Sequence, residues 1–461
     1  MSFAGRKVLV LGLGDTGLSM AKWLSRQGAS VRIADTRTEP PRLAELKRSL
    51  PFVPAHRGPF RDEIFADVDL IALSPGVPLA EPAVHRVLDA GVEVVGDIEL
   101  FAQALPEPRP QTIAVTGTNG KSTVASLAGA MARAAGADCE VAGNIGPAVL
   151  DALMRREDEG RTADVWVLEL SSFQLETTRS LSADAATVLN ISEDHLDRYA
   201  GIDEYASAKM RIFSGDGVQV LSRDDPRSLS MALPGRKTVT FGLDAPRREE
   251  DWGLLERGAE AWLAQGVHAH FALREMKFPG LHNAANALAA LALCRALDFP
   301  LEALLGALRE FKGLPHRVEL IGESDGVRWF DDSKGTNVGS TVAALDGLSH
   351  GDAKVILIAG GEGKGQNFSP LKDAVARSAR ALVLIGRDAP LIEAAVAGAG
   401  VPIRRAASMD EAVALAAQAA HVGDVVLLSP ACASFDMFRD YRHRGEVFRR
   451  AVEGRIDASK H

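Results

Sequence analysis

The chain has 461 residues, of which 46% are hydrophobic and 25% are charged, and its formal net charge is -9. This composition is typical of globular proteins and excludes fibrous and intrinsically disordered classes. The negative charge and the aromatic content of only 5% argue against nucleic acids and anionic membrane surfaces as partners. At roughly 150 residues per domain, the length favours three domains.

The cysteines and the hydropathy of the chain indicate its cellular compartment. Cys139, Cys294 and Cys432 are far apart and odd in number, which excludes a disulfide framework and a CxxC metal site and favours a reducing compartment. The N-terminal run VLVLGLG is short and interrupted by glycine, so we interpret it as a strand and not as a signal peptide. No apolar stretch reaches the roughly 18 to 20 residues of a membrane span. We therefore expect a soluble, cytoplasmic protein.

Short apolar, β-branched runs alternate along the chain with Ala-, Leu- and Arg-rich stretches of helical length. This alternation predicts an α/β fold with parallel sheets that helices cover on both faces. The expected strands are at residues 8–13, 31–34, 70–73, 113–115, 165–170, 186–189, 355–359, 382–385 and 425–428, and helices are expected at 18–27, 125–135 and 285–296.

The first expected strand leads into a glycine-rich turn, GLGDTG at residues 12–17, and Asp35 ends the second strand about 20 residues further on. This spacing is typical of a dinucleotide-binding Rossmann unit, so an NAD-dependent oxidoreductase is one hypothesis. Asp35 is followed by Thr36 and Arg37. The acid suits a uridine or ribose, and the hydroxyl and guanidinium suit a diphosphate. The sequence SPGV at residues 74–77 then ends the third strand with a turn that permits close backbone approach.

Two domain boundaries are suggested. The proline-rich segment LPEPRP at residues 105–110 precedes a new strand, which places a linker near residues 97–110. The second boundary falls near residue 314, where FKGLP follows a long helical region. We therefore predict domains at residues 1–96, 97–314 and 315–461.

The strongest local signal is TGTNGKST at residues 116–123, between an apolar strand and a helix. A glycine turn at a helix N-terminus directs backbone N–H groups and the positive end of the helix dipole at one point, which suits a polyphosphate. Lys121 is expected against the β and γ phosphates and the Ser122 hydroxyl on Mg²⁺. The loop departs from a standard Walker A sequence because Val115 stands where the first glycine is usual. A regulatory or motor NTPase is a second hypothesis.

This loop resembles that of the Mur ligase and folylpolyglutamate synthase superfamily, whose members activate a carboxylate with ATP and join it to an amine. The resemblance extends over nearly the whole chain. It implies ATP as co-substrate, two Mg²⁺ ions, and ATP contacts from the loop residues Gly117, Thr118, Asn119, Gly120, Lys121, Ser122 and Thr123.

Acidic and basic residues after the loop are candidates for metal binding. Glu169 ends an apolar strand, at the sheet edge where α/β proteins place ligands, although a solvated strand end fits the pattern equally well. His195 lies in LNISEDHLDRY beside Asp194 and Asp197, and a structural histidine is the commoner case. The pattern alone makes Lys209 a surface residue. The family resemblance implies that Glu169, His195 and Ser122 bind magnesium and that Lys209 is carbamylated by CO₂ to help hold the second ion.

The resemblance also assigns the two nucleotide ends of the substrates. Asn283 and Asn286, which by pattern would cap a helix, are implied to face the adenine of ATP. GLGDTG, DTR and SPG resemble the UDP-binding domain of the D-glutamate-adding branch of the family. The implied UDP-substrate contacts are Thr16, Asp35, Thr36, Arg37, Gly76, Asn144 and His195.

The C-terminal third carries the remaining motifs. LPHRVEL and DDSKGTN resemble the segments that close over ATP, with Arg317 toward the phosphates and Asp332 near the ribose. A cation with several hydroxyl or backbone donors suits the two carboxylates of an amino acid. The family's D-glutamate pocket maps onto Thr336, Lys364, Ser434, Phe435 and Tyr441. Two departures are Glu362, where aspartate is usual, and Tyr441, where phenylalanine is common. The DNPR-type motif of other branches is absent from the sequence.

The resemblance thus implies a Rossmann-like UDP-binding domain, a central P-loop-type ATPase domain with a parallel sheet, and a Rossmann-like C-terminal domain. The implied activity is ATP-dependent ligation of D-glutamate to UDP-N-acetylmuramoyl-L-alanine through an acyl phosphate. L-glutamate remains an alternative, since sequence does not fix the stereochemistry of the pocket. We expect small-molecule partners only, a monomer, and closure about a hinge near residue 314. The implied catalytic residues are Lys121, Glu169, His195, Lys209 and Lys364.

Overall fold

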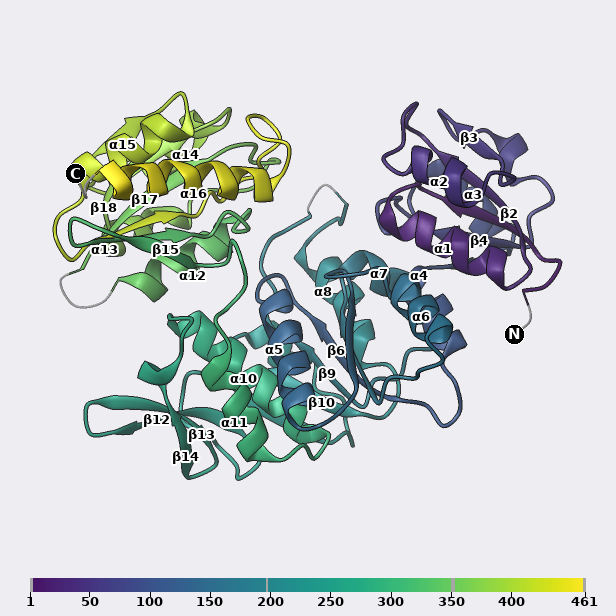
Figure 1. The fold of residues 1–461 in the computed structure, drawn as a ribbon, viewed down its shortest axis with the longest axis horizontal. Helices are drawn as coiled ribbons and strands as arrows, with labels where there is room; N and C mark the ends of the chain where they lie inside the picture. Colours follow the sequence, from purple (N-terminus) through teal and green to yellow (C-terminus); the bar gives the residue numbers. More distant parts are fainter. Residues whose placement is uncertain (1–2, 196–197, 350–352, 459–461) are drawn as a thin grey trace.

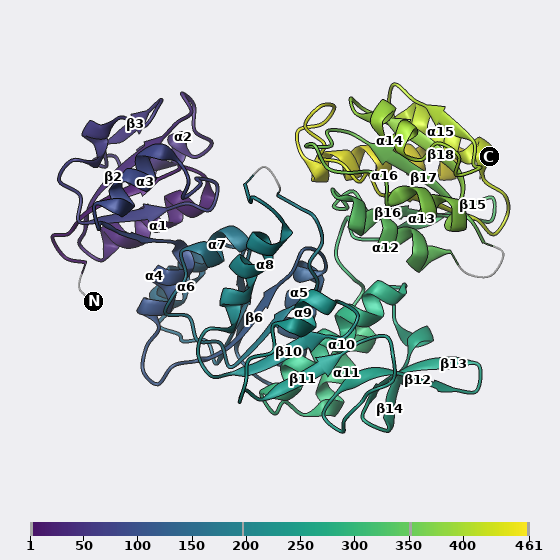
Figure 2. The ribbon, with the colours of Figure 1, turned by 180° about the vertical axis from the view of Figure 1, so that it is seen from behind.

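The computed structural model describes residues 3–195, 198–349 and 353–458. Three α/β units follow one another along the chain, each built on its own sheet (Figure 1). The first and third units lie on opposite sides of the middle unit in both views (Figures 1 and 2). The predicted α/β class is confirmed. Within the described residues, no helix combines the length and apolar character that crossing a membrane requires.

The N-terminal unit has a five-stranded parallel sheet in the order β3-β2-β1-β4-β5. Gly17 is required where α1 begins, because a Cβ there would lie 1.8 Å from the Gly12 carbonyl oxygen. The GLGDTG sequence therefore sets a close packing of helix on strand. The elements are β1 (Lys7–Leu11), α1 (Asp15–Arg26), β2 (Ser30–Asp35), α2 (Leu43–Ser49), β3 (Ala55–Arg57), β4 (Leu70–Leu73), α3 (Pro82–Asp89) and β5 (Glu93–Val95).

The middle unit has a nine-stranded sheet in the order β14-β13-β12-β11-β10-β9-β6-β8-β7. Strands β6 to β12 run parallel to one another, and β12, β13 and β14 form an antiparallel meander that the sequence patterns did not predict. The strands are β6 (Gln111–Thr116), β7 (Cys139–Gly143), β8 (Val165–Glu169), β9 (Ala185–Val188), β10 (Val218–Ser222), β11 (Thr238–Phe241), β12 (Trp252–Arg257), β13 (Glu260–Gln265) and β14 (His268–Ala272).

Helices cover both faces of this middle sheet. Helices α5, α10 and α11 pack together on one face, and α4, α6, α7 and α8 share the apolar core of the other. The linker predicted for residues 97–110 is partly wrong, because residues 97–104 form α4, which packs on α6 and α7. The helices are α4 (Asp97–Ala104), α5 (Lys121–Ala134), α6 (Val149–Asp158), α7 (Ser172–Glu176), α8 (Ile202–Met210), α9 (Pro226–Ser230), α10 (Leu281–Ala296) and α11 (Leu301–Glu310).

The C-terminal unit has a six-stranded sheet in the order β15-β16-β20-β17-β18-β19, parallel except for β15. Apolar cores lie on both of its faces. The elements are β15 (Glu319–Ser324), β16 (Val327–Asp331), α12 (Val338–Leu348), β17 (Val355–Gly360), α13 (Leu371–Ser378), β18 (Ala379–Ile385), α14 (Ala389–Ala395), β19 (Ile403–Arg405), α15 (Met409–Ala419), β20 (Val425–Leu428) and α16 (Tyr441–Ala458).

One continuous apolar core joins the first unit to the second. It runs from α1 of the N-terminal unit, which packs on α6 of the middle unit, to α4 and β8, where Phe101 meets Trp166 edge to face at 4.8 Å within the middle unit. The burial of apolar surface across this boundary stabilises one placement of the N-terminal unit on the middle sheet. The loops at the carboxyl ends of both sheets are thereby held in a fixed relation.

Candidate active site

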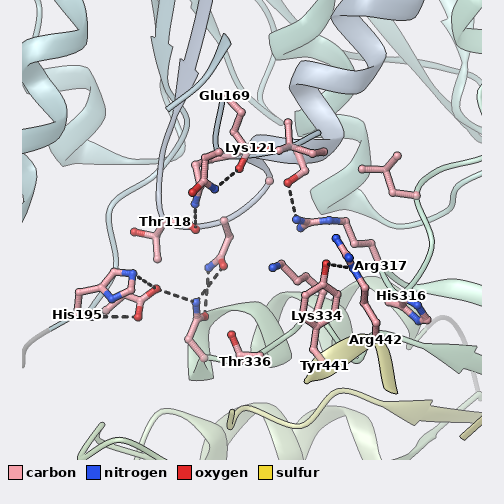
Figure 3. A pocket seen from close by; sticks show the side chains of 18 of the residues that line it. Thr118, Lys121, Glu169, His195, His316, Arg317, Lys334, Thr336, Tyr441 and Arg442 are labelled. Carbon is pink, nitrogen blue, oxygen red and sulfur yellow. Dashed lines mark hydrogen bonds and ion pairs between the residues drawn. The ribbon is translucent and has the colours of Figure 1, made fainter. Parts of the chain in front are cut away.

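A cavity of about 870 Å³ lies where residues of all three units meet. Figure 3 shows Lys121 and Glu169 on one side of it and Thr336, Lys334 and Tyr441 facing them from another. The cavity brings together residues predicted separately for ATP, metal, UDP-sugar and glutamate. The predicted residues among its lining are Thr118, Asn119, Gly120, Lys121, Ser122, Asn144, Glu169, His195, Arg317, Thr336, Lys364 and Tyr441.

The phosphate loop connects β6 to α5 as the sequence predicted. Gly120 has a φ of 85°, and a Cβ there would lie 2.4 Å from the Asn286 Oδ1, so the turn requires glycine. Lys121 curls over the loop and donates hydrogen bonds to the carbonyls of Gly117 at 2.9 Å and Thr118 at 2.8 Å. Burial lowers the pKa of Lys121, although the negative charges of nearby acids act to raise it. The loop is thus preformed around an ammonium group.

A second cavity, of about 370 Å³, lies against the same loop. It contains four of the five remaining predicted ATP residues, Thr123, Asn283, Asn286 and Asp332. The fifth, Gly117, lines neither cavity. Asn286 donates to the Asn283 Oδ1 at 3.3 Å, so the two amides form a connected polar edge. Burial raises the pKa of Asp332 to about 7, although it accepts a hydrogen bond from Ser429 at 2.6 Å. Sequence reasoning missed His282, which also lines this cavity.

Glu169 meets the requirements of a cation ligand. It is buried, and its Oε1 accepts a hydrogen bond from the Asn144 Nδ2 at 2.6 Å. Its Oε2 is buried without a hydrogen-bond partner among the described residues. A carboxylate oxygen in this state is energetically costly unless a cation or donor completes it. The side chain therefore fits a hard metal ion that arrives with the substrates.

Lys209 lies beneath the phosphate loop and is not part of the cavity lining. Its Nζ donates to the Gly117 carbonyl at 2.9 Å and to the Thr116 Oγ1 at 3.2 Å, and it lies 4.6 Å from the centre of the Tyr205 ring. Burial, followed by the charge of Lys121, sets its pKa well below the usual range. The sequence-pattern interpretation of a surface lysine is wrong, because α8 turns this side chain into the core.

His195 lies on the cavity wall in a left-handed backbone conformation, with a φ of 56°. Its imidazole Nε2 is 3.8 Å from the Asp194 Oδ2, and its ring meets the Phe173 ring at 4.6 Å. These contacts orient the imidazole at the cavity wall, which Glu169 also lines. Asp197, noted beside it in the sequence, lies outside the described residues.

The C-terminal unit reaches the phosphate loop directly. The Arg317 Nη2 donates to the Ser122 Oγ at 2.6 Å. The side-chain amides of Asn119 and Asn337 exchange hydrogen bonds of 3.1 and 3.3 Å across the same boundary. The C-terminal and middle units are therefore in contact at the phosphate loop, and both line the cavity.

The predicted glutamate residues separate into two groups. Thr336, Lys364 and Tyr441 line the cavity, and Lys364 is held with a φ of 51°. Ser434 is buried and Phe435 is 66% exposed, and neither lines the cavity.

Sequence reasoning also missed cations on this side of the cavity. Lys334 lies within DDSKGTN, where its charge was the available signal, and Arg442 lies beside Tyr441. Burial, then the neighbouring Arg317, lowers the pKa of Lys334 to about 8. Its Nζ lies 4.0 Å from the centre of the Tyr441 ring. The cavity therefore offers more positive charge than the predicted residues alone provide.

The predicted UDP residues of the N-terminal unit lie at or just after the carboxyl ends of β1, β2 and β4, where open α/β sheets bind ligands. The other two, Asn144 and His195, belong to the middle unit and line the main cavity. The Asp35 carboxylate accepts hydrogen bonds from the Leu13 backbone at 2.7 Å and from the Arg37 Nη2 at 2.6 Å. Burial tends to raise the pKa of Asp35, but the hydrogen bonds from Arg37 and Leu13 lower it overall. Asp15 of the same unit, to which the sequence analysis gave no role, lines the main cavity.

The fold and this cavity define a three-domain α/β enzyme whose phosphate loop belongs to the middle unit and lines a cavity that all three units share. Sequence comparison agrees: residues 6–96 match the model of the Mur ligase MurD-like N-terminal domain, residues 115–294 the Mur ligase middle domain, and residues 316–432 the Mur ligase glutamate ligase domain. The chain belongs to the Mur ligase family.

Relatives of nearly full length are similar to this chain. The UDP-N-acetylmuramoylalanine--D-glutamate ligase of Nitrosospira multiformis is 58% identical, with 98% of this chain and 96% of that protein covered. The protein of the same name from Thiobacillus denitrificans is also 58% identical, with coverages of 98% and 97%. The structure of the UDP-N-acetylmuramate-alanine ligase of Thermotoga maritima has a TM-score of 0.61 at 20% identity, with coverages of 97% and 99%, which shows the shared fold.

Proposed function

We propose that this chain ligates D-glutamate to UDP-N-acetylmuramoyl-L-alanine at the expense of ATP, giving UDP-N-acetylmuramoyl-L-alanyl-D-glutamate, ADP and phosphate for peptidoglycan synthesis. The observation that carries the proposal is the single cavity in which the phosphate loop, Asn144 and Lys364 face one another from different parts of the chain. The similarity over nearly the whole chain to ligases of that name supports the same substrates.

The phosphate loop holds ATP in this proposal. Lys121 exchanges its two carbonyl partners for phosphate oxygens, which replace neutral acceptors with charged ones. Asn283 and Asn286 present amide donors and acceptors to the adenine, and Asp332 accepts from the ribose. Arg317, already beside Ser122, neutralises charge on the phosphates. ATP then lies across both cavities, with its γ-phosphate in the larger one.

We propose two magnesium sites at this position. Ser122, Glu169 and His195 offer a hydroxyl, an unsatisfied carboxylate oxygen and an imidazole. The lowered pKa of Lys209 favours the unprotonated amine, which attacks CO₂ and loses a proton to give a carbamate. That carbamate provides an anionic oxygen ligand in place of the amine. Magnesium, when bound, supplies charge neutralisation for the phosphates and the attacking carboxylate.

The nucleotide sugar spans the N-terminal and middle units in this account. Thr16, Asp35, Thr36, Arg37 and Gly76 form its UDP end, and Asn144 and His195 lie toward its alanyl end. The alanyl carboxylate attacks the γ-phosphorus of ATP, ADP leaves, and an acyl phosphate forms. Lys121 and Arg317 stabilise the charge that develops in this step.

The amino acid enters from the C-terminal unit. Lys364 and Thr336 hold the carboxylates of D-glutamate, with Tyr441 as a wall. Its amine attacks the acyl carbon, and phosphate leaves with the oxygen that bridged carbon and phosphorus. Ser434 and Phe435 act in this step only if the loop that carries them moves toward the cavity. We also propose a monomer that works in the cytoplasm, where ATP and nucleotide sugars are available.

The test measures phosphate release from ATP in the presence of UDP-N-acetylmuramoyl-L-alanine. Three reactions are compared, with no amino acid, with D-glutamate and with L-glutamate. Release that depends on D-glutamate supports the proposal. Dependence on L-glutamate keeps the chemistry but changes the substrate, and release without any amino acid supports the NTPase hypothesis. Nicotinamide nucleotide binding would support the oxidoreductase hypothesis, which leaves the phosphate loop without a role.

A further inference from the structure

Arg198 makes a polar contact between two units of the chain. It follows the His195 loop of the middle unit, and its Nη1 donates to the Pro75 carbonyl of the N-terminal unit at 2.6 Å. Pro75 precedes Gly76 in the turn that the proposed function assigns to UDP. The side chain is only 10% exposed, so the contact is made away from bulk water.

Glu176 holds the guanidinium in this position. The Arg198 Nη2 donates to one carboxylate oxygen of Glu176 at 2.7 Å, and the Tyr199 hydroxyl donates to the other at 2.5 Å. Glu176 is itself only 14% exposed and ends α7 of the middle unit. A planar guanidinium that serves two acceptors at once has little freedom to rotate. Arg198 is therefore fixed by the middle unit and points at the N-terminal unit.

The same side chain also supports His195. The Arg198 guanidinium carbon lies 4.0 Å from the centre of the Phe173 ring. The Phe173 ring in turn meets the His195 imidazole at 4.6 Å. The backbone N–H of Arg198 and that of Tyr199 both donate to the His195 carbonyl, at 2.9 and 3.2 Å. Arg198 thus contacts both the UDP turn and the residues that orient His195.

We propose that Arg198 is a positioning residue that sets the distance between the UDP-binding turn and the reaction centre. A nucleotide sugar that spans both units binds well only when its two ends are presented at the correct separation. The guanidinium contacts the Pro75 carbonyl directly and the His195 imidazole through the Phe173 ring, so a shift at one is resisted at the other. This inference rests on the proposed function, because it requires a substrate that bridges the two units.

The test compares three full-length variants with the wild-type protein. Arg198→Gln removes the charge and the two-acceptor geometry, and Arg198→Lys keeps a charge for Glu176 but not the planar fork that also reaches Pro75. Arg26→Gln is the matched control, because Arg26 of α1 forms ion pairs with Glu157 and Asp158 of α6 across the same boundary but away from the turn. Melting temperatures establish that each variant is folded.

Binding of UDP-N-acetylmuramoyl-L-alanine is measured by calorimetry, and KM is measured for each substrate. Loss of one charge-assisted contact predicts about tenfold weaker binding of the nucleotide sugar, and a similar rise in its KM, in both Arg198 variants. The KM for ATP and for D-glutamate should stay within about twofold, since their predicted pockets do not touch Arg198. Arg26→Gln should bind the nucleotide sugar as the wild type does.

Three outcomes would overturn the inference. If both Arg198 variants bind the nucleotide sugar with wild-type affinity and KM, the contact is merely structural. The same conclusion follows if Arg26→Gln loses as much affinity for the nucleotide sugar as the Arg198 variants do. An equal rise in the KM of all three substrates would indicate general distortion. If the wild-type protein itself fails to bind the nucleotide sugar, the proposed function fails and the inference fails with it. Failure of the inference alone is recognised because the wild-type protein then still binds the nucleotide sugar.

Discussion

The guanidinium of Arg317 donates a hydrogen bond of 2.6 Å to the hydroxyl of Ser122, although 195 residues separate them. Arg317 follows the predicted hinge near residue 314, and Ser122 is the first hydroxyl after the loop lysine. The contact therefore ties the C-terminal unit to the place where phosphates and magnesium are proposed to bind. The hinge motion remains a prediction, and nucleotide binding would have to exchange this contact for one to phosphate.

Removal of Arg317 should weaken nucleotide binding. Arg317→Ala deletes a charge-assisted contact to phosphate, worth about 1.5 to 3 kcal/mol, so the Kd for a non-hydrolysable ATP analogue should rise about tenfold or more. Titration calorimetry measures this value. Arg309→Ala, which removes an exposed arginine of α11 paired with Glu275, is the control. Equal affinity in Arg317→Ala and wild type would contradict the proposed role.

Lys364 should determine the affinity for the amino acid. Lys364→Ala removes a cation from the proposed glutamate pocket, and the KM for D-glutamate should rise about 10- to 100-fold. The KM for ATP and for the nucleotide sugar should change little, because Lys364 is not among the residues assigned to either of them. Steady-state kinetics with each substrate varied in turn checks this. A rise confined to the ATP KM would place Lys364 elsewhere in the mechanism.

Lys209 should carry a carbamate in the working enzyme. Protein prepared under carbon-13-labelled CO₂ should show a carbamate carbonyl resonance that is absent from Lys209→Ala. Since burial lowers the pKa of Lys209, the unprotonated amine should already form below the usual lysine range, and the resonance should weaken as pH falls through that lowered pKa. Identical spectra from the two proteins would remove Lys209 from the proposed metal site.

Asp332 should make the unliganded protein less stable as pH rises toward 7. Its pKa is about 7 in the folded chain, above the ordinary value, so the folded state binds more protons between pH 4 and 7. The contribution of Asp332 to the free energy of unfolding is therefore largest at low pH. It declines as pH rises, by at most about 1.4 kcal/mol per pH unit. Asp332→Asn should flatten this part of the pH profile of denaturant unfolding. An unchanged slope would contradict the assignment of the titration to Asp332.

Much of the fold follows from local patterns. Each of the nine apolar runs expected as strands contributes to a strand, and the glycine loop stands between β6 and α5 as predicted. The antiparallel meander of residues 252–272 was missed, although its two turns carry Gly258 and Gly266 in left-handed conformations, a recognisable hairpin signal. The domain boundaries at residues 96 and 314 stay predictions.

The site was less predictable because its parts meet only through tertiary packing. Motif resemblance selected Lys121, Glu169 and Lys364, which line one cavity. No local pattern reports that Lys209 is buried beneath the loop, or that Lys334 faces the cavity with a lowered pKa. Ser434 and Phe435 show the converse, since a matching motif does not ensure that each of its side chains lines the cavity. Their role in glutamate binding stays a prediction.

The most direct test follows the oxygen atoms of the alanyl carboxylate. UDP-N-acetylmuramoyl-L-alanine labelled with oxygen-18 at that carboxylate is incubated with ATP, D-glutamate and the enzyme, and the released phosphate is analysed by mass spectrometry. The account predicts that each phosphate carries an oxygen-18 atom from the carboxylate and that the dipeptide product forms in equal amount. Unlabelled phosphate, which would have taken its oxygen from water, would contradict ligation through an acyl phosphate at this site.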